Sequence, residues 1–419
     1  MSQTLRFPLI FLVCCADLAA ADGSWQARMR DAARLDQAGR YTDAQRLYAA
    51  ALEEAQSSGQ QDRRLAESLN NLAAHYFQRG RYDDAEPLYR RSIDVWGTLG
   101  DTGSRDLAVT MNNLAALYRA RGRYREAEPL YTAALERLEK TSGPASLEVA
   151  AGLNNLAELY RSLGRYKEAE SAARRSVEIS EMVDGGATLR TAASLFTLAG
   201  VQRDLGRYGE ALKLLERSLA IRESALGPGH VQVAAALGNM ADVYSLQRRF
   251  AEAEPLARRS LEIRESALGP EHPDVAVGLN NLAQVLRLQG RYIEAEPLYR
   301  RALATWEKSL GPEHPNVAKG LGNLADFYHE RGREQAAETL LVRALAIEEK
   351  ALGKDHPQVG ILSRNLADVY LVQGRFRRAE EMQKKALRIF EKTFGAGDPM
   401  YRKTLEGYTR IEAMIKGLR

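Results

Sequence analysis

The sequence predicts an all-α solenoid, in which about nine helix pairs stack into a right-handed superhelix. One reason is a Gly-Arg-Tyr motif, or a close variant of it, that recurs along the chain. The first interval between copies is 41 residues, and the following seven intervals are 42 residues each. Apolar residues with helical spacing flank each copy, and the chain is rich in the helix formers Ala, Leu, Arg and Glu. A fixed period in this range is typical of stacked supersecondary units. The glycines are Gly39, Gly80, Gly122, Gly164, Gly206, Gly290, Gly332 and Gly374, and Arg248 stands in the sixth place.

The first residues have the pattern of a secretory signal peptide. Arg6 precedes the apolar run Phe7–Ala16, and an Ala-x-Ala sequence ends at Ala21. The run is shorter than the roughly 20 residues of a membrane-spanning helix. We expect cleavage after Ala21 and a periplasmic or secreted protein; the alternative is a hydrophobic cap on the first repeat of a cytoplasmic protein. Cys14 and Cys15 are the two cysteines and lie in this run, so the mature chain would hold no disulfide and no thiolate metal site.

The repeat around Gly122 shows how one unit is built. Residues 107–121 carry apolar side chains at i, i+3, i+4 and i+7 counted from Met111, which is one face of an α-helix. Gly122 then ends the helix, because glycine enters the left-handed conformation without a steric penalty. Residues 125–140 show helical spacing again. Each unit is therefore predicted to be a helix, a short turn, a second helix and a longer connection.

The connections and the C-terminus complete the predicted domain organisation. Later connections follow a Gly-Pro-Glu-His-Pro pattern, in which glycine stops one helix and proline prevents its continuation. Asp398 and Pro399 have the residue types of a cap and a first turn, so a final helix is expected to about Lys416. The expected segments are a signal peptide at 1–21, the repeat array at 22–397 and a capping helix at 398–419.

Composition favours no particular class of partner. The chain has 59 Lys and Arg against 55 Asp and Glu, for a net charge of +4, and such balance does not call for nucleic acid or an anionic membrane. Paired basic residues on the second helices are expected to lie on the solvated outer face of the array. No apolar stretch after residue 24 is long enough to cross a bilayer.

The repeat resembles the tetratricopeptide repeat, through the small and aromatic residues around its Gly-x-Tyr-x-x-Ala pattern. Its 42-residue form, with residues 279–283, 290–292, 295–298 and 310–315, is similar to the kinesin light chain subclass over roughly residues 25–395. The resemblance implies an adaptor that binds peptide segments in a concave groove lined by the first helices. The coiled-coil segment that joins kinesin light chains to a motor has no counterpart here, so the resemblance implies the repeat type and not motor cargo transport.

An asparagine recurs at one position of the first helices, opposite the core face, and we call this set the asparagine ladder. Helical geometry predicts that Asn113 lies near the centre of the exposed face, and Thr197 is the one substitution in the set. An amide can donate to and accept from the main chain of an extended peptide, and the resemblance also implies a peptide-binding asparagine here. The alternative is that the amides bond across to the adjacent repeat and only rigidify the array. The ladder consists of Asn71, Asn113, Asn155, Asn239, Asn281, Asn323 and Asn365.

Charged residues flank the ladder. An arginine shared by four repeats, three of them successive, predicts a basic stripe across the middle repeats. These arginines could pair with an acidic peptide or a C-terminal carboxylate, or could pair locally with glutamate as solvated side chains. Aspartates in later repeats predict a groove that becomes more acidic along its length. The arginines are Arg119, Arg161, Arg203 and Arg287, and the aspartates are Asp242, Asp326 and Asp368. Asparagines that precede ladder positions, Asn70, Asn112, Asn154 and Asn280, are expected on the flank, where contacts between repeats are favoured.

Catalytic and metal-binding patterns are absent from the sequence. It has no Gly-rich phosphate loop, zinc-binding His-Glu-x-x-His helix or Gly-x-Ser-x-Gly turn. The histidines of the later connections occur one per connection, and stacking would space them along an edge, so we expect them to stabilise turns and not to bind a metal ion. They are His230, His272, His314 and His356. The prediction is a non-enzymatic scaffold without cofactor that binds extended peptides of an unidentified protein partner in the groove. The alternatives are a self-associating structural repeat protein and an accessory subunit of an exported or envelope complex.

Overall fold

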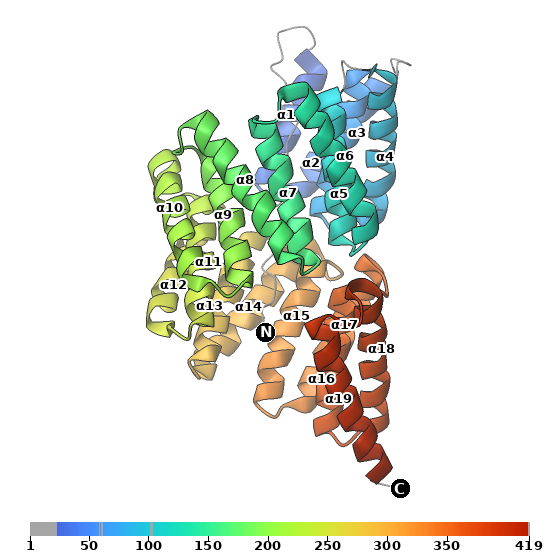
Figure 1. Cartoon of the computed structure of the whole chain (residues 1–419), viewed down its shortest axis with the longest axis vertical. Coiled ribbons are helices and arrows are strands. Elements are labelled where there is room, and N and C mark those ends of the chain that lie inside the picture. Colours follow the sequence, from blue (N-terminus) through green and yellow to red (C-terminus); the bar gives the residue numbers. More distant parts are fainter. Residues whose placement is uncertain (1–22, 58, 60–61, 101–103, 418–419) are drawn as a thin grey trace. The chain divides into compact units, whose positions relative to one another are not determined.

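The computed structural model describes residues 23–57, 59, 62–100 and 104–417. These residues form 19 α-helices and no strand, which confirms the predicted all-α solenoid (Figure 1). The helices are α1 (Gly23–Gln37), α2 (Tyr41–Ser57), α3 (Arg63–Gln78), α4 (Tyr82–Thr98), α5 (Ser104–Ala120), α6 (Tyr124–Ser142), α7 (Leu147–Ser162), α8 (Tyr166–Asp184), α9 (Leu189–Asp204), α10 (Tyr208–Leu226), α11 (Val231–Leu246), α12 (Phe250–Leu268), α13 (Pro273–Leu288), α14 (Tyr292–Leu310), α15 (Pro315–Glu330), α16 (Glu334–Leu352), α17 (Pro357–Val372), α18 (Phe376–Phe394) and α19 (Pro399–Gly417).

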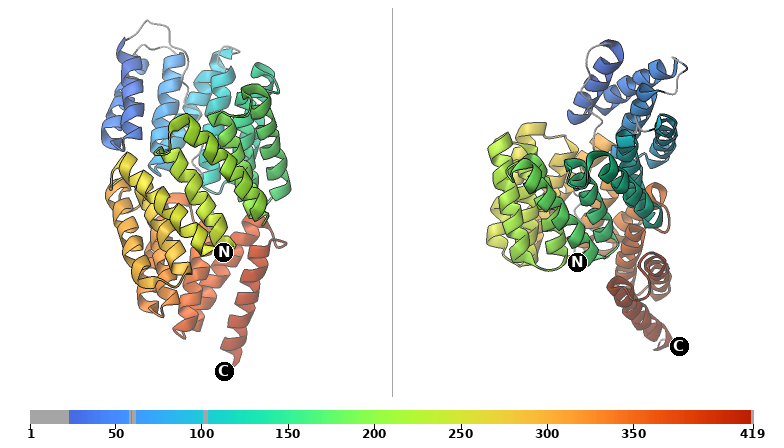
Figure 2. Two further views of the ribbon diagram at one scale, coloured as in Figure 1. Left: turned by 90° about the vertical axis from the view of Figure 1, so that its left-hand side faces the viewer. Right: turned by 45° about the horizontal axis from the view of Figure 1, so that its top comes forward.

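Consecutive helices form pairs, each joined by a short turn. The odd-numbered helices from α1 to α17 are the first helices of the repeats, and the even-numbered ones are the second helices. A second helix also packs against the first helix of the next repeat, as α6 does against α7. Figure 2 shows these paired helices side by side in two further views. Each helix therefore buries one face within its own repeat and another against its neighbour, which is how a solenoid builds a continuous core.

The chain divides into two compact units, Met1–Val243 and Tyr244–Arg419, and the division falls within α11. The core of the first unit includes Trp96 and Leu138, both fully buried. The core of the second unit includes Trp306 and Phe390, which are also fully buried. Fully buried alanines at the crossings let the helices approach closely within each unit.

The turn glycines behave as the repeat pattern predicts. Gly122, between α5 and α6, has a φ of 67°, in the left-handed region that glycine enters without steric cost. Arg248 occupies the same turn position with a φ of 61° and is the one non-glycine residue with positive φ in the described part of the chain. The turn conformation therefore persists at the sixth repeat although the residue type changes.

The histidines of the connections are helix caps. The Nδ1 atoms of His272, His314 and His356 accept backbone N–H groups two residues later at 3.0–3.1 Å, and a proline follows each histidine. Burial lowers the pKa of His272, which favours the neutral ring that this acceptor role requires. The expectation that these residues stabilise turns is thereby confirmed.

The structure describes the C-terminal helix α19 but not residues 1–22. At the C-terminus, the Asp398 carboxylate accepts the Met400 N–H at 2.7 Å and caps α19. The proposed signal peptide lies outside the described residues. Within the described part, no helix is both long enough and apolar enough to cross a membrane.

Candidate functional site

The asparagine ladder lies on the first helices but is less exposed than its helical position predicts. Asn113, Asn155 and Asn323 expose only 5%, 6% and 7% of their surface, and the other members are half-buried. First helices of adjacent repeats contact each other directly, as α5 contacts α7 and α7 contacts α9. Neighbouring helices therefore cover a face that a single helix would leave open, and the expectation of an exposed face was wrong for these residues.

Three ladder members bond across to the preceding repeat. The Asn113 Nδ2 atom donates to Asn70 Oδ1 at 2.9 Å, and Asn323 Nδ2 donates to Asn280 Oδ1 at 2.8 Å. Asn365 Nδ2 donates to a carboxylate oxygen of Asp326 at 3.0 Å. These amides join adjacent first helices, as the alternative interpretation of the ladder predicts for them.

The other four members make no such bond. Asn71 accepts from its neighbour Asn70 at 3.0 Å, and Asn239 donates to the Ala235 carbonyl of its own helix at 2.9 Å. Asn155 and Asn281 make no side-chain hydrogen bond with any residue that the structure describes. The ladder therefore contains two kinds of amide, those that connect repeats and those still able to bind another group.

The arginines beside the ladder were expected to form a basic stripe, but two of them are buried in one ion-pair network. Asp204 on α9 accepts from Arg161 Nε at 2.8 Å with one oxygen and from Arg203 Nε at 3.0 Å with the other. Arg203 also donates to Asp242 at 3.0 Å, and Arg161 to Glu158 at 2.6 Å. The side chains of Arg161, Arg203 and Asp204 expose 7% of their surface or less. Their charges are neutralised between repeats and do not line an open surface.

The remaining two arginines differ from each other. Arg287 on α13 forms an ion pair with Glu330 on α15, again between adjacent repeats. Arg119 on α5 is half-buried and forms no ion pair with a described residue. Of the predicted basic stripe, only Arg119 remains without a carboxylate.

Two of the three aspartates of the later repeats also make polar contacts with other repeats. Asp242 pairs with Arg203, and Asp326 accepts from Asn365. Burial raises the pKa of Asp326 to about 6, although the charge of Arg287 opposes this rise. Asp368 is exposed on α17. The predicted acidic character of the later repeats is therefore carried by an exposed Asp368 and a partly covered Asp326.

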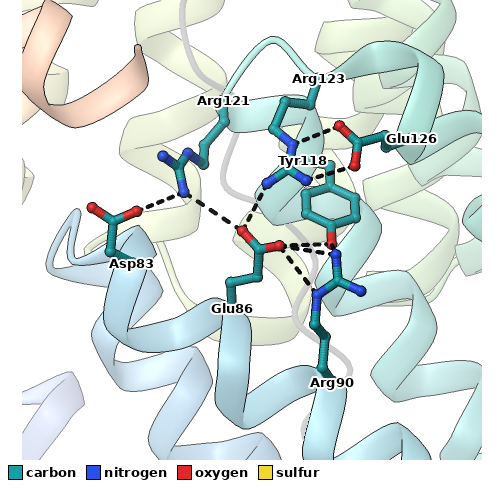
Figure 3. A network of polar contacts seen from close by, with 7 residues as sticks. All are labelled: Asp83, Glu86, Arg90, Tyr118, Arg121, Arg123 and Glu126. Carbon is teal, nitrogen blue, oxygen red and sulfur yellow. Dashed lines mark hydrogen bonds and ion pairs between the residues drawn. The ribbon is translucent and has the colours of Figure 1, made fainter.

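A second polar network joins repeats at the turns, and sequence reasoning missed it (Figure 3). Glu86 on α4 accepts from Arg123 at 2.7 Å, from the Tyr118 hydroxyl at 2.9 Å and from Arg90 at 3.0 Å. Burial opposes the ionisation of Glu86, but these hydrogen bonds outweigh it and lower the pKa of the carboxyl. Nearby, Arg121 of the same turn reaches Asp83 at 2.8 Å. Together these contacts tie the second helix of one repeat to the turn of the next.

The contact between Glu86 and Arg123 recurs along the chain, and we call it the glutamate clamp. Each clamp joins the glutamate of Ala-Glu-Pro-Leu, or its equivalent, to the arginine of Gly-Arg-Tyr 37 residues later. That constant spacing is the signal by which the sequence could have revealed it. The other clamps are Glu128 with Arg165, Glu170 with Arg207, Glu254 with Arg291, Glu296 with Arg333 and Glu338 with Arg375.

Comparison with known proteins identifies the repeat. The family model described as tetratricopeptide repeat matches residues 34–97, 106–182, 190–266, 233–292, 274–350 and 317–392, most of the chain. Among curated proteins, none matches this sequence.

Similar solved structures come from several organisms. A Podosopora anserina protein described as a kinesin light chain with nearly identical TPR-like repeats is 28% identical, with a TM-score of 0.41, over 49% of this chain and 96% of that one. BtubC from P. vanneervenii is 23% identical, with a TM-score of 0.44, over 56% and 92%. Aspartyl phosphate phosphatase F from Bacillus subtilis is 15% identical, with a TM-score of 0.52, over 91% and 97%. At that identity, the likeness to the phosphatase shows the fold alone.

Proposed function

Since the chain belongs to the tetratricopeptide repeat family, we propose that it is a non-enzymatic scaffold that holds extended peptide segments of partner proteins against its first helices. The observation that carries the proposal is that the ladder amides of Asn155 and Asn281 make no hydrogen bond with any described residue. Asparagine is a poor helix former, so its recurrence at one helical position needs a physical reason. For Asn113, Asn323 and Asn365 the reason is a bond between repeats.

An amide suits a peptide main chain because it has one donor group and one acceptor group. A peptide N–H can donate to the side-chain oxygen while the peptide carbonyl accepts from the side-chain nitrogen. Such pairing does not depend on the side chains of the peptide. Asn239 could join this set by exchanging its bond with its own helix, at Ala235, for a bond to a ligand.

The non-enzymatic part of the proposal rests on the sequence, which lacks the nucleophile, phosphate-loop and zinc motifs of common enzyme classes. In the described residues, no three or more His, Cys, Asp or Glu side chains are grouped in a way that could hold a metal ion. One similar structure is named as a phosphatase, but a shared fold does not carry a shared reaction.

The proposal includes export of the protein. The basic residue, the short apolar run and the Ala-x-Ala sequence at the N-terminus support cleavage after Ala21. N-terminal sequencing of protein made in its native host should find a chain that starts at Asp22. A cytoplasmic protein that keeps Met1 or Ser2 would contradict export.

The two kinds of ladder amide allow a matched test of peptide binding. The probe is a peptide selected by the full chain from a random peptide library. In the triple variant N155A, N239A and N281A, we expect affinity for this peptide to fall roughly ten- to thousandfold, because each hydrogen bond contributes about 0.5–1.5 kcal/mol. Thermal stability should hold or rise slightly, since alanine is the better helix former.

The matched control is the double variant N113A and N323A. It leaves the buried oxygens of Asn70 and Asn280 without their donors, so we expect a lower melting temperature. Circular dichroism melts and binding titrations on the same samples separate the two effects. Unchanged affinity in the triple variant would end the assignment of these amides to peptide binding.

A further inference from the structure

The arginine of the Gly-Arg-Tyr motif has an acidic partner in its own turn in most repeats. Six of the first seven of these arginines bind the acidic residue that follows three positions later, and Arg207 is the exception. Arg291 shows the geometry, because its Nε and Nη2 atoms donate to the two carboxylate oxygens of Glu294, both at 2.7 Å. We call this side of the guanidinium the Nε–Nη2 edge. The acidic residues are Asp43, Asp84, Glu126, Glu168, Glu210, Glu252 and Glu294.

Arg333, in the eighth repeat, lacks this partner, since the residue three positions later is Ala336. Its Nη1 atom forms an ion pair with Glu296 at 3.6 Å, and the side chain makes no hydrogen bond with any residue that the structure describes. The side chain is 59% exposed. The Nε–Nη2 edge of Arg333 is therefore unoccupied and can be reached from solvent.

Arg375, in the ninth repeat, also lacks the partner, since Arg378 stands three positions later. Its Nη1 atom donates to the Glu338 carboxylate at 2.6 and 2.7 Å and to Gln373 at 2.8 Å. Its Nε and Nη2 atoms make no hydrogen bond within the described part of the chain. The clamp to Glu338 thus holds the guanidinium in place while the Nε–Nη2 edge stays unoccupied.

A cavity of about 620 Å³ brings these two arginines together. Residues of the α15–α16 turn and of the α17–α18 turn line it, among them Arg333, Ala336 and Arg375. Both arginines therefore share one cavity with a position from which a carboxylate is missing. Glu334 also lines the cavity, but its carboxylate lies 2.7 Å from His329 Nδ1 and its side chain exposes only 15% of its surface.

The surface around the cavity is basic. Arg331, Arg377 and Arg378 are exposed in the same two turns, and none of them forms an ion pair with a described residue. The first turn of α18 contains no acidic residue, whereas the first turn of α14 contains Glu294. Such a concentration of one charge sign attracts an anionic partner.

We propose that this cavity is a second interaction surface, which binds an acidic peptide segment of a partner protein through the Nε–Nη2 edges of Arg333 and Arg375. Glu294 shows that a carboxylate is the group this edge accepts, through two parallel N–H groups. In the last two repeats the partner would supply the carboxylate that the earlier repeats supply from their own chain. No residue of the asparagine ladder lines the cavity, so this surface is separate from the one proposed above.

The test titrates the full chain with three probes, which are a capped hexaglutamate peptide, a capped hexaglutamine peptide and single-stranded hexathymidylate. We expect hexaglutamate to bind about tenfold more tightly than hexaglutamine, or better, and more tightly than the oligonucleotide. Equal affinity for the two peptides would refute the inference. Tighter binding of hexathymidylate would identify a phosphate ligand and would also refute an acidic peptide.

The variant A336E restores the missing carboxylate within the chain. The new side chain should occupy the Nε–Nη2 edge of Arg333 and lower the affinity for hexaglutamate about tenfold. Thermal stability should hold or rise slightly, because an acidic residue near the start of a helix is favourable. The matched control is A413E, the same substitution at an exposed position on α19, which should keep the affinity.

The variant R333Q removes the guanidinium itself, and we expect a similar loss of affinity for hexaglutamate. Its matched control is R410Q, on α19, because Arg410 is exposed and has no ion pair among the described residues. Since A336E and R333Q act on the same edge, the double variant should lose little more than either single variant. Additive losses would mean that Glu at position 336 repels the peptide without occupying Arg333, which contradicts the inference.

Two further outcomes separate this surface from the ladder. If A336E and R333Q bind hexaglutamate as tightly as the wild type, the acidic peptide docks elsewhere and the inference fails, while peptide binding by the ladder is untouched. The triple ladder variant N155A, N239A and N281A should keep its affinity for hexaglutamate. A loss of affinity in that variant would assign the acidic peptide to the ladder and overturn the proposed second surface.

Discussion

The substitution D204A is expected to lower the free energy of unfolding by about 3–5 kcal/mol, as a broken buried ion pair typically does. Asp204 accepts from both Arg161 and Arg203, which belong to adjacent first helices. The arginine side chains expose 5% and 3% of their surface. Without Asp204, two buried guanidinium groups lose the carboxylate that they share, although Arg161 still contacts Glu158 and Arg203 still contacts Asp242. Urea denaturation followed by circular dichroism measures the effect.

The matched control for this prediction is D83A. Asp83 also pairs with an arginine, Arg121, at 2.8 Å, but its side chain exposes 83% of its surface. An exposed ion pair contributes about 0–1 kcal/mol, so D83A should change stability little. Equal losses in D83A and D204A would show that burial of the network around Asp204 adds nothing to stability.

The substitution E254Q is expected to lower stability by about 1–2 kcal/mol at pH 7, because solvent screening at this partly exposed carboxyl reduces what the pKa shift alone would give. Burial opposes the ionisation of Glu254, but hydrogen bonds from Gln289, Arg258 and Arg291 outweigh it and lower its pKa to about 2. The folded-state pKa lies below the ordinary glutamate value of 4.5. The stabilising contribution is therefore fully present above about pH 4.5 and is lost as the pH falls to about 2.

The pH dependence distinguishes the clamp from general effects of the substitution. Denaturation midpoints of wild type and E254Q should differ at pH 7 and converge as the pH falls from 4.5 towards 2. The control is E262Q, on the same helix α12, because Glu262 is exposed and has no ion pair among the described residues. If the difference in denaturation midpoint between E254Q and wild type stays constant over this pH range, the negative charge of Glu254 does not contribute to the stability of the clamp.

Much of the fold could be predicted from the sequence because its causes are local. The 42-residue period sets the number of repeats, and the apolar spacing around Gly122 predicts two helices and the turn between them. The cap at Asp398 follows from a side chain that accepts a backbone N–H two residues away. Each of these features depends on residues close together in the chain.

The candidate site depends on contacts that a single helix does not contain. Helical geometry predicts an exposed Asn113, but the neighbouring repeat covers it and Asn70 accepts its N–H group. The arginines of the expected basic stripe have the same residue type and the same repeat position. Only the packing of adjacent first helices distinguishes Arg161, which meets Asp204 43 residues later, from Arg119, which meets no carboxylate in the described structure.

The sequence by itself therefore determined that this protein is a tetratricopeptide array, roughly where its paired helices and turns lie, and which positions recur along one face. The tertiary structure alone decided which of those positions are occupied by neighbouring repeats and which keep unpaired polar groups. The physical reason is that helix formation follows a period of a few residues, whereas the ion pairs and amide contacts join residues 37–43 positions apart. Whether such side chains meet depends on how closely successive repeats pack.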